Sequence, residues 1–259
     1  MDMPRYFLEI AFDGTPYRGW QRQPDAPSVQ EEVERALQFA LHRPKVNAVG
    51  CGRTDTGVHA TSFFLHFDLP EGQGPGPRFH HSLNGLLPPG IAVKRVIPVA
   101  DDAHARFSAT ERGYVYLIHR LKDPFLEGRS YLLHPALDVD AMNDACRALM
   151  GRQDFSSFQR VGSDNRTAIC DVRLAQWEHT LEGYRFTIRA DRFLRNMVRA
   201  IVGTCLQVGK GQRPPSDMAA VLAARDRSHA GKSAPARGLY LAQVAYPFLP
   251  APTHRDENT

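Results

Sequence analysis

Residues 46–69, VNAVGCGRTDTGVHATSFFLHFDL, place a polar loop between two apolar segments. The segments at 46–50 and 61–69 are short apolar runs of the kind that form strands. The loop between them, residues 53–59, carries an arginine, an aspartate and a histidine. Two glycines flank the aspartate, so the backbone there can approach a ligand closely. This loop is therefore the first candidate for a functional site.

The elements around the loop predict an α+β unit. A strand with alternating apolar residues opens the chain, and a helix with an apolar stripe follows it. Ser28 is a good N-cap for this helix, and Glu31 stands at the capping-box position. The order is β-α-β-β-α-β, with elements expected at 5–13, 28–41, 46–50, 61–69, 79–86 and 91–99.

The second half repeats this order with different residues. Its first helix has one apolar face, and its long second helix stops at a glycine-rich break. The elements are expected at 112–121, 138–150, 167–178, 184–190, 193–208 and 239–246. We therefore predict two pseudo-repeated ferredoxin-like halves, residues 1–102 and 103–259, whose antiparallel sheets join, with the active-site cleft between them.

The composition of the 259-residue chain excludes several classes of protein. The chain has four cysteines and no Cys-x-x-Cys pair, which argues against a disulfide scaffold or a zinc ribbon. No apolar run approaches the roughly 20 residues of a membrane span, and no leader pattern opens the chain. We expect a cytoplasmic protein with no metal site and no membrane association.

Positive charge is concentrated in one part of the chain. The net charge is +4, from 32 Lys and Arg against 28 Asp and Glu. Residues 1–100 are neutral, whereas residues 185–237 contain eleven basic and three acidic residues. This local excess suits a polyanion such as nucleic acid. The alternative is an ordinary solvated basic face.

The residues of the loop leave the role of Asp55 open. A carboxylate in a glycine-flanked loop can act on a ligand. It can equally cap a turn, with Arg53 paired on the surface.

Six short motifs in a fixed order carry a resemblance. They are Tyr17-Arg-Gly-Trp-Gln-Arg-Gln23, Gly52-Arg-Thr-Asp-Thr-Gly-Val-His59, His104-Ala-Arg-Phe-Ser-Ala109, Tyr114-Val-Tyr116, Met197-Val-Arg-Ala-Ile-Val-Gly203 and Gly238-Leu-Tyr-Leu241. With them the chain resembles the tRNA pseudouridine synthase A family from residue 5 to about residue 246.

The resemblance implies an enzyme that isomerises uridine to pseudouridine at positions 38, 39 and 40 of the tRNA anticodon stem-loop. It also implies a homodimer without a cofactor, with Asp55 as the catalytic nucleophile. The reaction cuts N1 from C1′ and rejoins uracil through C5, with no net redox change or hydrolysis. Asp55 can add to C1′, stabilise an oxocarbenium-like species or assist glycal formation, and the sequence does not choose among these.

The resemblance assigns four further site residues. Arg199 matches the ion-pair partner of Asp55 across the cleft, and Tyr114 matches the tyrosine that stacks on the target base and handles a proton. Arg53 and Arg106 are expected to contact substrate, because a guanidinium fork grips phosphate oxygens in pairs. As alternatives, Arg199 faces a phosphate, and Tyr114 packs in its strand beside a second tyrosine.

Other residues and functions complete the expectations. Thr56 stands where the family has a small residue, and its branched side chain is expected to tighten the loop. Trp20, Phe107 and Leu239 are expected in the core or the cleft wall. A runner-up function is a catalytically idle tRNA-binding or folding protein. A further alternative is the same isomerisation on a different RNA uridine.

Overall fold

The computed structural model describes residues 4–70, 74–162 and 166–250. Its strands are β1 Arg5–Phe12, β2 Val49–Gly50, β3 His59–Asp68, β4 Ile91–Val99, β5 Glu111–His119, β6 Tyr131–Leu132, β7 Gly151–Asp154, β8 Ile169–His179, β9 Gly183–Ala190 and β10 Leu239–Ala245. Its α-helices are α1 Val29–Ala40, α2 Phe79–Leu86, α3 Val139–Arg147, α4 Met197–Gly209 and α5 Asp217–Ala224.

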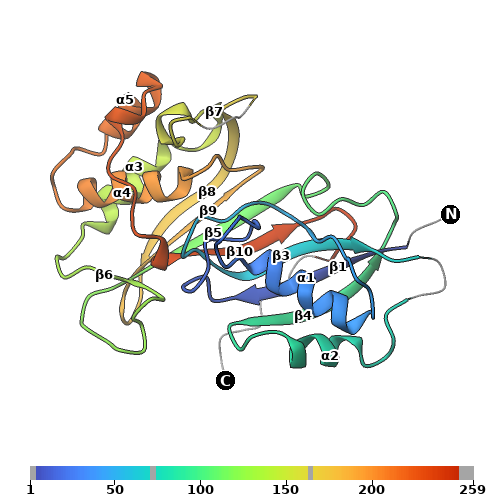
Figure 1. Cartoon of the computed structure of the whole chain (residues 1–259). Helices are drawn as coiled ribbons and strands as arrows, with labels where there is room; N and C mark the ends of the chain where they lie inside the picture. The colour runs from blue at the N-terminus through green and yellow to red at the C-terminus, as the bar shows by residue number, and fades with distance from the viewer. Residues whose placement is uncertain (1–3, 71–73, 163–165, 251–259) are drawn as a thin grey trace.

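The strands form one large sheet, which confirms the α+β class. The strand order is β4-β1-β3-β10-β5-β9-β8-β7, with β2 paired to β3 and β6 paired to β5. Figure 1 shows α1 and α2 beside the end of the sheet that contains β1 and β4, and α3, α4 and α5 together near the other end. No helix in the described part of the chain is long and apolar enough to cross a membrane.

The predicted elements of the first half are all present. The Ser28 hydroxyl accepts a hydrogen bond from the Glu31 N–H at 3.4 Å, so the predicted cap of α1 is confirmed. Val29, Val33 and Leu37 form the buried face of that helix. The prediction made β2 too long and started β3 two residues too late, since β2 has two residues and β3 begins at His59.

The second half contains the predicted elements together with three that were not predicted, β6, β7 and α5. Its long helix also begins later than expected, at Met197 instead of residue 193. Asn196 has φ 67°, a left-handed conformation that a right-handed helix cannot continue. Residues 191–196 therefore form a turn at the start of α4.

Strand β10 joins the two parts of the sheet. It pairs antiparallel with β5, and it pairs parallel with β3 through Tyr240 opposite His59 and Leu241 opposite Ala60. The other strand pairs are antiparallel as expected, except that β5 pairs parallel with the two-residue strand β6. The last strand of the chain brings β3 next to the second part of the sheet.

Two separate clusters of buried side chains lie on the two sides of this joint. Trp20 is among the largest side chains of the first cluster and Trp177 of the second. Tyr114, on β5, packs against both clusters. The four cysteines are buried free thiols, as expected. Among the described residues, no group of three or more His, Cys, Asp and Glu side chains is arranged to hold a metal ion.

Candidate active site

The predicted carboxylate and its predicted arginine lie together. Asp55 comes from the loop between β2 and β3, and Arg199 comes from the first turn of α4. The Arg199 Nη1 lies 3.4 Å from the Asp55 Oδ2, and the two side chains are 21% and 24% exposed. A second cation, the Arg195 guanidinium, has its Nε 3.8 Å from the Asp55 Oδ1 and is 58% exposed. Two guanidinium groups therefore flank one partly buried carboxylate.

The loop that carries Asp55 is fixed by the first of the six motifs. Gly19 has φ 92°, and a Cβ there would lie 2.2 Å from the Thr54 carbonyl oxygen, so only glycine fits. The Trp20 N–H donates to the Thr54 hydroxyl at 3.0 Å, and the Gly57 N–H donates to the Tyr17 carbonyl at 3.2 Å. These contacts explain why residues 17–20 and the aspartate loop belong to one site.

The Arg199 side chain is held by a segment next to α4. Its Nε donates to the Ala234 carbonyl at 2.7 Å, and the Ala234 N–H donates back to the Arg199 carbonyl at 2.9 Å. Gly203, one turn further along α4, allows this approach. A Cβ at Gly203 would lie 1.8 Å from the Lys232 carbonyl oxygen. The guanidinium is therefore oriented toward Asp55 before any ligand arrives.

Tyr114 and Tyr116 point to the same face of β5 but have different environments. The Tyr116 ring is fully buried, and its hydroxyl donates to the Pro235 carbonyl at 2.9 Å. The half-buried Tyr114 ring meets Phe193 edge to face at 5.1 Å, and its hydroxyl has no hydrogen-bond partner in the described residues. Burial raises the pKa of Tyr114 above its ordinary value, and the neighbouring Asp55 carboxylate adds to the shift. Packing within the sheet therefore explains the position of Tyr116, whereas the Tyr114 hydroxyl is available to bind a ligand.

The other two predicted arginines are exposed, and the described residues include no carboxylate paired with either. Arg53 lies in the aspartate loop. The Arg106 guanidinium lies over the ring of Phe107, 5.5 Å from its centroid. Phe107 is 75% exposed, so it does not lie in the core, whereas Trp20 and Leu239 are buried as expected.

Two details of the aspartate loop concern Thr56 and His59. Thr56 is exposed, so its extra methyl group occupies no buried space. His59 is buried, accepts a hydrogen bond from the Gly14 N–H on Nδ1 at 3.1 Å, and has its Nε2 3.2 Å from the Arg237 carbonyl. These contacts give His59 a structural role at the joint between β3 and β10.

The basic segment 185–237 is partly neutralised within the fold. Six of its eleven cations form ion pairs with carboxylates, namely Arg185, Arg189, Arg195, Arg199, Arg225 and Arg237. The other five have no carboxylate partner among the described residues, namely Arg192, Lys210, Arg213, Arg227 and Lys232. The cations available to an anionic ligand are therefore fewer than the sequence count indicates.

A flanked carboxylate beside a partly exposed tyrosine fits an enzyme that acts on a nucleobase and its sugar. Residues 145–247 match the model of a family described as tRNA pseudouridine synthase. The chain is 46% identical to tRNA pseudouridine synthase A of Parabacteroides distasonis, over 95% of this chain and 97% of that protein. It is 47% identical to the Bacteroides thetaiotaomicron protein of the same name, over 95% of this chain and 91% of that protein. The chain belongs to the tRNA pseudouridine synthase A family.

A more distant solved structure, described as an H/ACA ribonucleoprotein bound to a substrate RNA containing 2'-deoxyuridine, aligns with 78% of this chain and 53% of its own chain. The identity is 11% and the TM-score is 0.34.

Proposed function

We propose that this protein converts uridine to pseudouridine at positions 38, 39 and 40 of the tRNA anticodon stem-loop, in the cytoplasm, as a homodimer and without a cofactor. The observation that carries the proposal is the contact between the Asp55 carboxylate and the Arg199 guanidinium. Membership of the family supplies the reaction and the tRNA. The three positions and the dimer rest on the resemblance of the motifs.

The reaction needs one nucleophile and no change of oxidation state. In the proposed course, the Asp55 carboxylate adds to C1′ of the target nucleotide, and N1 leaves with the electrons of the glycosidic bond. The released uracil turns so that C5 faces C1′. C5 then forms the new bond, the carboxylate leaves, C5 loses its proton, and N1 gains one. Atoms and charge balance without another reactant.

The neighbours of Asp55 have separate tasks in this scheme. Arg199 orients the carboxylate from across the joint and supplies positive charge beside it. Tyr114 stacks on the extruded base, which returns part of the few kcal/mol that unstacking costs. The raised pKa of Tyr114 keeps its phenol protonated at neutral pH, which favours stacking and hydrogen-bond donation over proton removal. Arg53 and Arg106 bind phosphates of the tRNA.

We also infer that the two halves, residues 1–102 and 103–259, are a pseudo-repeat of ferredoxin-like units with the active-site cleft between them. Each half contains the predicted β-α-β-β-α-β elements in order, and the buried side chains form two clusters, each drawn mainly from one half. Asp55 comes from the first half and Arg199 from the second. A site that needs both halves explains why they share one sheet.

Mapping of pseudouridine in tRNA tests the function. Transfer RNA from cells that lack this protein should have uridine at positions 38, 39 and 40, and purified protein should restore pseudouridine there. The Asp55→Ala protein should bind the same tRNA and form no product. Product from Asp55→Ala, or restoration only at other positions, would refute the assignment.

The homodimer has a separate test. If the tRNA site needs two copies, dilution below the dimer dissociation constant should remove activity in step with the loss of dimer seen by sedimentation. A fully active monomer would contradict this part of the proposal and leave the role of Asp55 untouched.

A further inference from the structure

Arg112 was not predicted as a site residue, yet its side chain makes several hydrogen bonds around the site. It lies on β5 two residues before Tyr114 and points to the same face of the sheet. Its Nη1 donates to the carbonyls of Ala109 at 3.0 Å and Asp191 at 3.1 Å. Its Nη2 donates to the carbonyls of Cys51 at 3.2 Å and Arg106 at 2.5 Å. One guanidinium therefore binds four backbone carbonyls.

These carbonyls belong to three segments around the site: the connection to the aspartate loop, the loop that contains Arg106, and the turn that leads to Arg195. Cys51 is four residues before Asp55, in the connection from β2 to the aspartate loop. The carbonyls of Arg106 and Ala109 belong to the loop that presents the exposed Arg106 side chain. Asp191 begins the turn that leads to Arg195. Arg112 thus connects the aspartate loop of the first half to two segments of the second.

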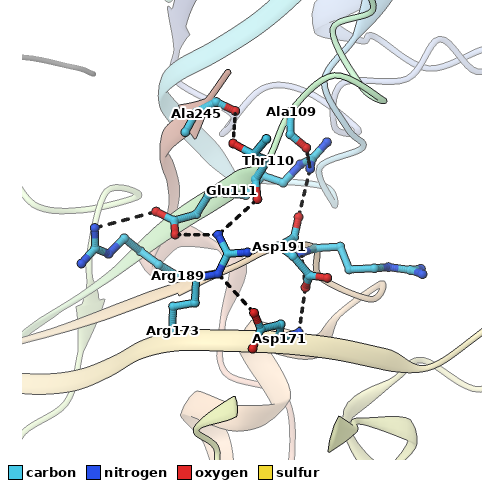
Figure 2. A network of polar contacts seen from close by, with 10 residues as sticks. Ala109, Thr110, Glu111, Asp171, Arg173, Arg189, Asp191 and Ala245 are labelled. Carbon is cyan, nitrogen blue, oxygen red and sulfur yellow. Dashed lines mark hydrogen bonds and ion pairs between the residues drawn. The ribbon is translucent and has the colours of Figure 1, made fainter. Parts of the chain in front are cut away.

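The Asp191 end of this arrangement is independently fixed. The Asp191 carboxylate accepts hydrogen bonds from the backbone N–H groups of Asp171 and Arg192, both at 2.7 Å. Figure 2 shows the Asp191 carboxylate reaching the Asp171 backbone and the Asp191 carbonyl on the opposite side of the residue. Arg112 therefore attaches the aspartate loop to a turn that the β8 backbone already holds.

We propose that Arg112 is a positioning residue that sets the place of Asp55 relative to the second half, a role that rests on the proposed function. Its planar fork has five N–H donors, so it can serve carbonyls on several sides at once. A lysine ammonium has three donors on one atom and cannot span the same carbonyls. The role therefore requires the guanidinium and not the charge alone.

Loss of these contacts should act on the chemical step. Without Arg112, four carbonyls lose their donor, and the Cys51 connection is released from β5. A displacement of about 1 Å at reacting groups can cost about 100-fold in rate. The affinity for tRNA depends mainly on phosphate contacts from exposed cations. We therefore expect kcat to fall and the Kd for tRNA to change little.

The test compares Arg112→Gln and Arg112→Lys with the wild-type protein in single-turnover assays on bound tRNA. Both variants should lose about 100-fold in rate, with a Kd for tRNA close to that of the wild type. Added guanidinium at a concentration that leaves the wild type unchanged should raise the rate of Arg112→Gln, and added methylammonium should not. If Arg112→Gln fails to fold, Arg112→Lys decides by the rate and the Kd.

Arg173→Gln is the matched control. Arg173 lies on β8, and Figure 2 shows its guanidinium between the side chains of Glu111 and Asp171. It donates to the Thr110 carbonyl at 3.3 Å but to none of the carbonyls that Arg112 binds. Its rate should remain close to that of the wild type. A full rate in Arg112→Lys, or equal losses in Arg112→Lys and Arg173→Gln, would overturn the proposal. An inactive wild-type protein would instead refute the proposed function.

Discussion

The two arginines beside Asp55 differ in how firmly they are held. Arg199 is one-fifth exposed and hydrogen-bonded to the Ala234 carbonyl, whereas Arg195 is more than half exposed. Hydrogen bonds to charged groups are worth about 1.5–3 kcal/mol, or roughly 10- to 150-fold. We expect Arg199→Lys to lower the single-turnover rate by about that factor and Arg195→Lys to lower it less than tenfold. Equal losses in the two variants would contradict this ranking.

The role of Tyr114 is tested by removing first its hydroxyl and then its ring. The hydroxyl bonds to nothing in the described fold, so Tyr114→Phe should keep the melting temperature and most of the activity. Tyr114→Ala should weaken tRNA binding about 5- to 150-fold, because stacking on one base is worth about 1–3 kcal/mol. Tyr116→Phe is the control and should lose stability through the hydrogen bond to Pro235. A large loss of rate in Tyr114→Phe would favour proton handling over stacking.

Among individual residues, the site residues that stand in motifs could be predicted from the sequence. Those whose side chains bind only the backbone could not. Asp55, Arg199 and Tyr114 stand in motifs, and the structure brings the Asp55 carboxylate and the Arg199 guanidinium into contact. Arg112 was not predicted because its partners are backbone carbonyls. Every residue has a backbone carbonyl, so the sequence does not indicate such contacts. Phe107 was misplaced because an apolar residue in a loop is usually covered, and here it is not.

Among the elements, the contact of α4 with residues 231–234 controls the Arg199 side chain. A Cβ at Gly203 would collide with the Lys232 carbonyl, so Gly203→Ala should push this segment away and release the Ala234 carbonyl from Arg199. We expect a lower melting temperature and a lower rate of isomerisation. Gly85→Ala in α2 is the control, because nothing lies within 4 Å of its added Cβ. It should keep the rate and stabilise the protein by up to about 1 kcal/mol. An unchanged rate in Gly203→Ala would show that the Ala234 contact is dispensable.

Helices and strands with a clear periodicity of apolar residues were predicted from the sequence, whereas β6, β7 and α5 were not. Helices α1 and α3 have one buried face each, which gives the 3.6-residue pattern. Strand β6 has only two residues and β7 only four, too few for any period to appear. Helix α5 follows two prolines that indicated a break, although proline is also common in the first turn of a helix.

For the whole molecule, acid stability should depend on a buried histidine in the first half. His66 accepts a hydrogen bond from the Ala105 N–H at 3.1 Å, and burial lowers its pKa to about 4, with Arg5 and His104 adding to the shift. An unfolded histidine has a pKa of about 6.5. As the pH falls from 6.5 to 4, the unfolded chain binds a proton that the folded chain rejects, so the free energy of unfolding decreases.

The pH profile of unfolding by denaturant checks this effect. His66→Gln should flatten the loss of stability between pH 6.5 and 4, and His179→Gln, at an exposed position, should leave it unchanged. The whole effect is at most about 3 kcal/mol. An identical acid profile in His66→Gln and the wild type would exclude His66 as the cause.

The arrangement of the halves was only partly predictable. The order of helices and strands within each half follows from the local periodicity of apolar residues, and the predicted elements occur in that order in the structure. The parallel contact of β10 with β3 could not be foreseen, because it rests on two residue pairs whose members are 181 positions apart along the chain. No local pattern encodes so short a pairing, which is fixed by β10 packing with both buried clusters.

The distribution of unpaired cations over the molecule sets the salt dependence of tRNA binding. Lys232 is exposed, lies in the segment against α4, and has no carboxylate partner in the described structure. If it contacts a phosphate, Lys232→Gln should reduce the slope of log K against log salt by about one. Lys45→Gln removes the same charge from an exposed position in the neutral half, so its slope should match that of the wild type. Arg225 is paired with Asp154, so Arg225→Gln should change the slope less than Lys232→Gln does. Equal slopes in all three variants would mean that Lys232 contacts no phosphate of the tRNA.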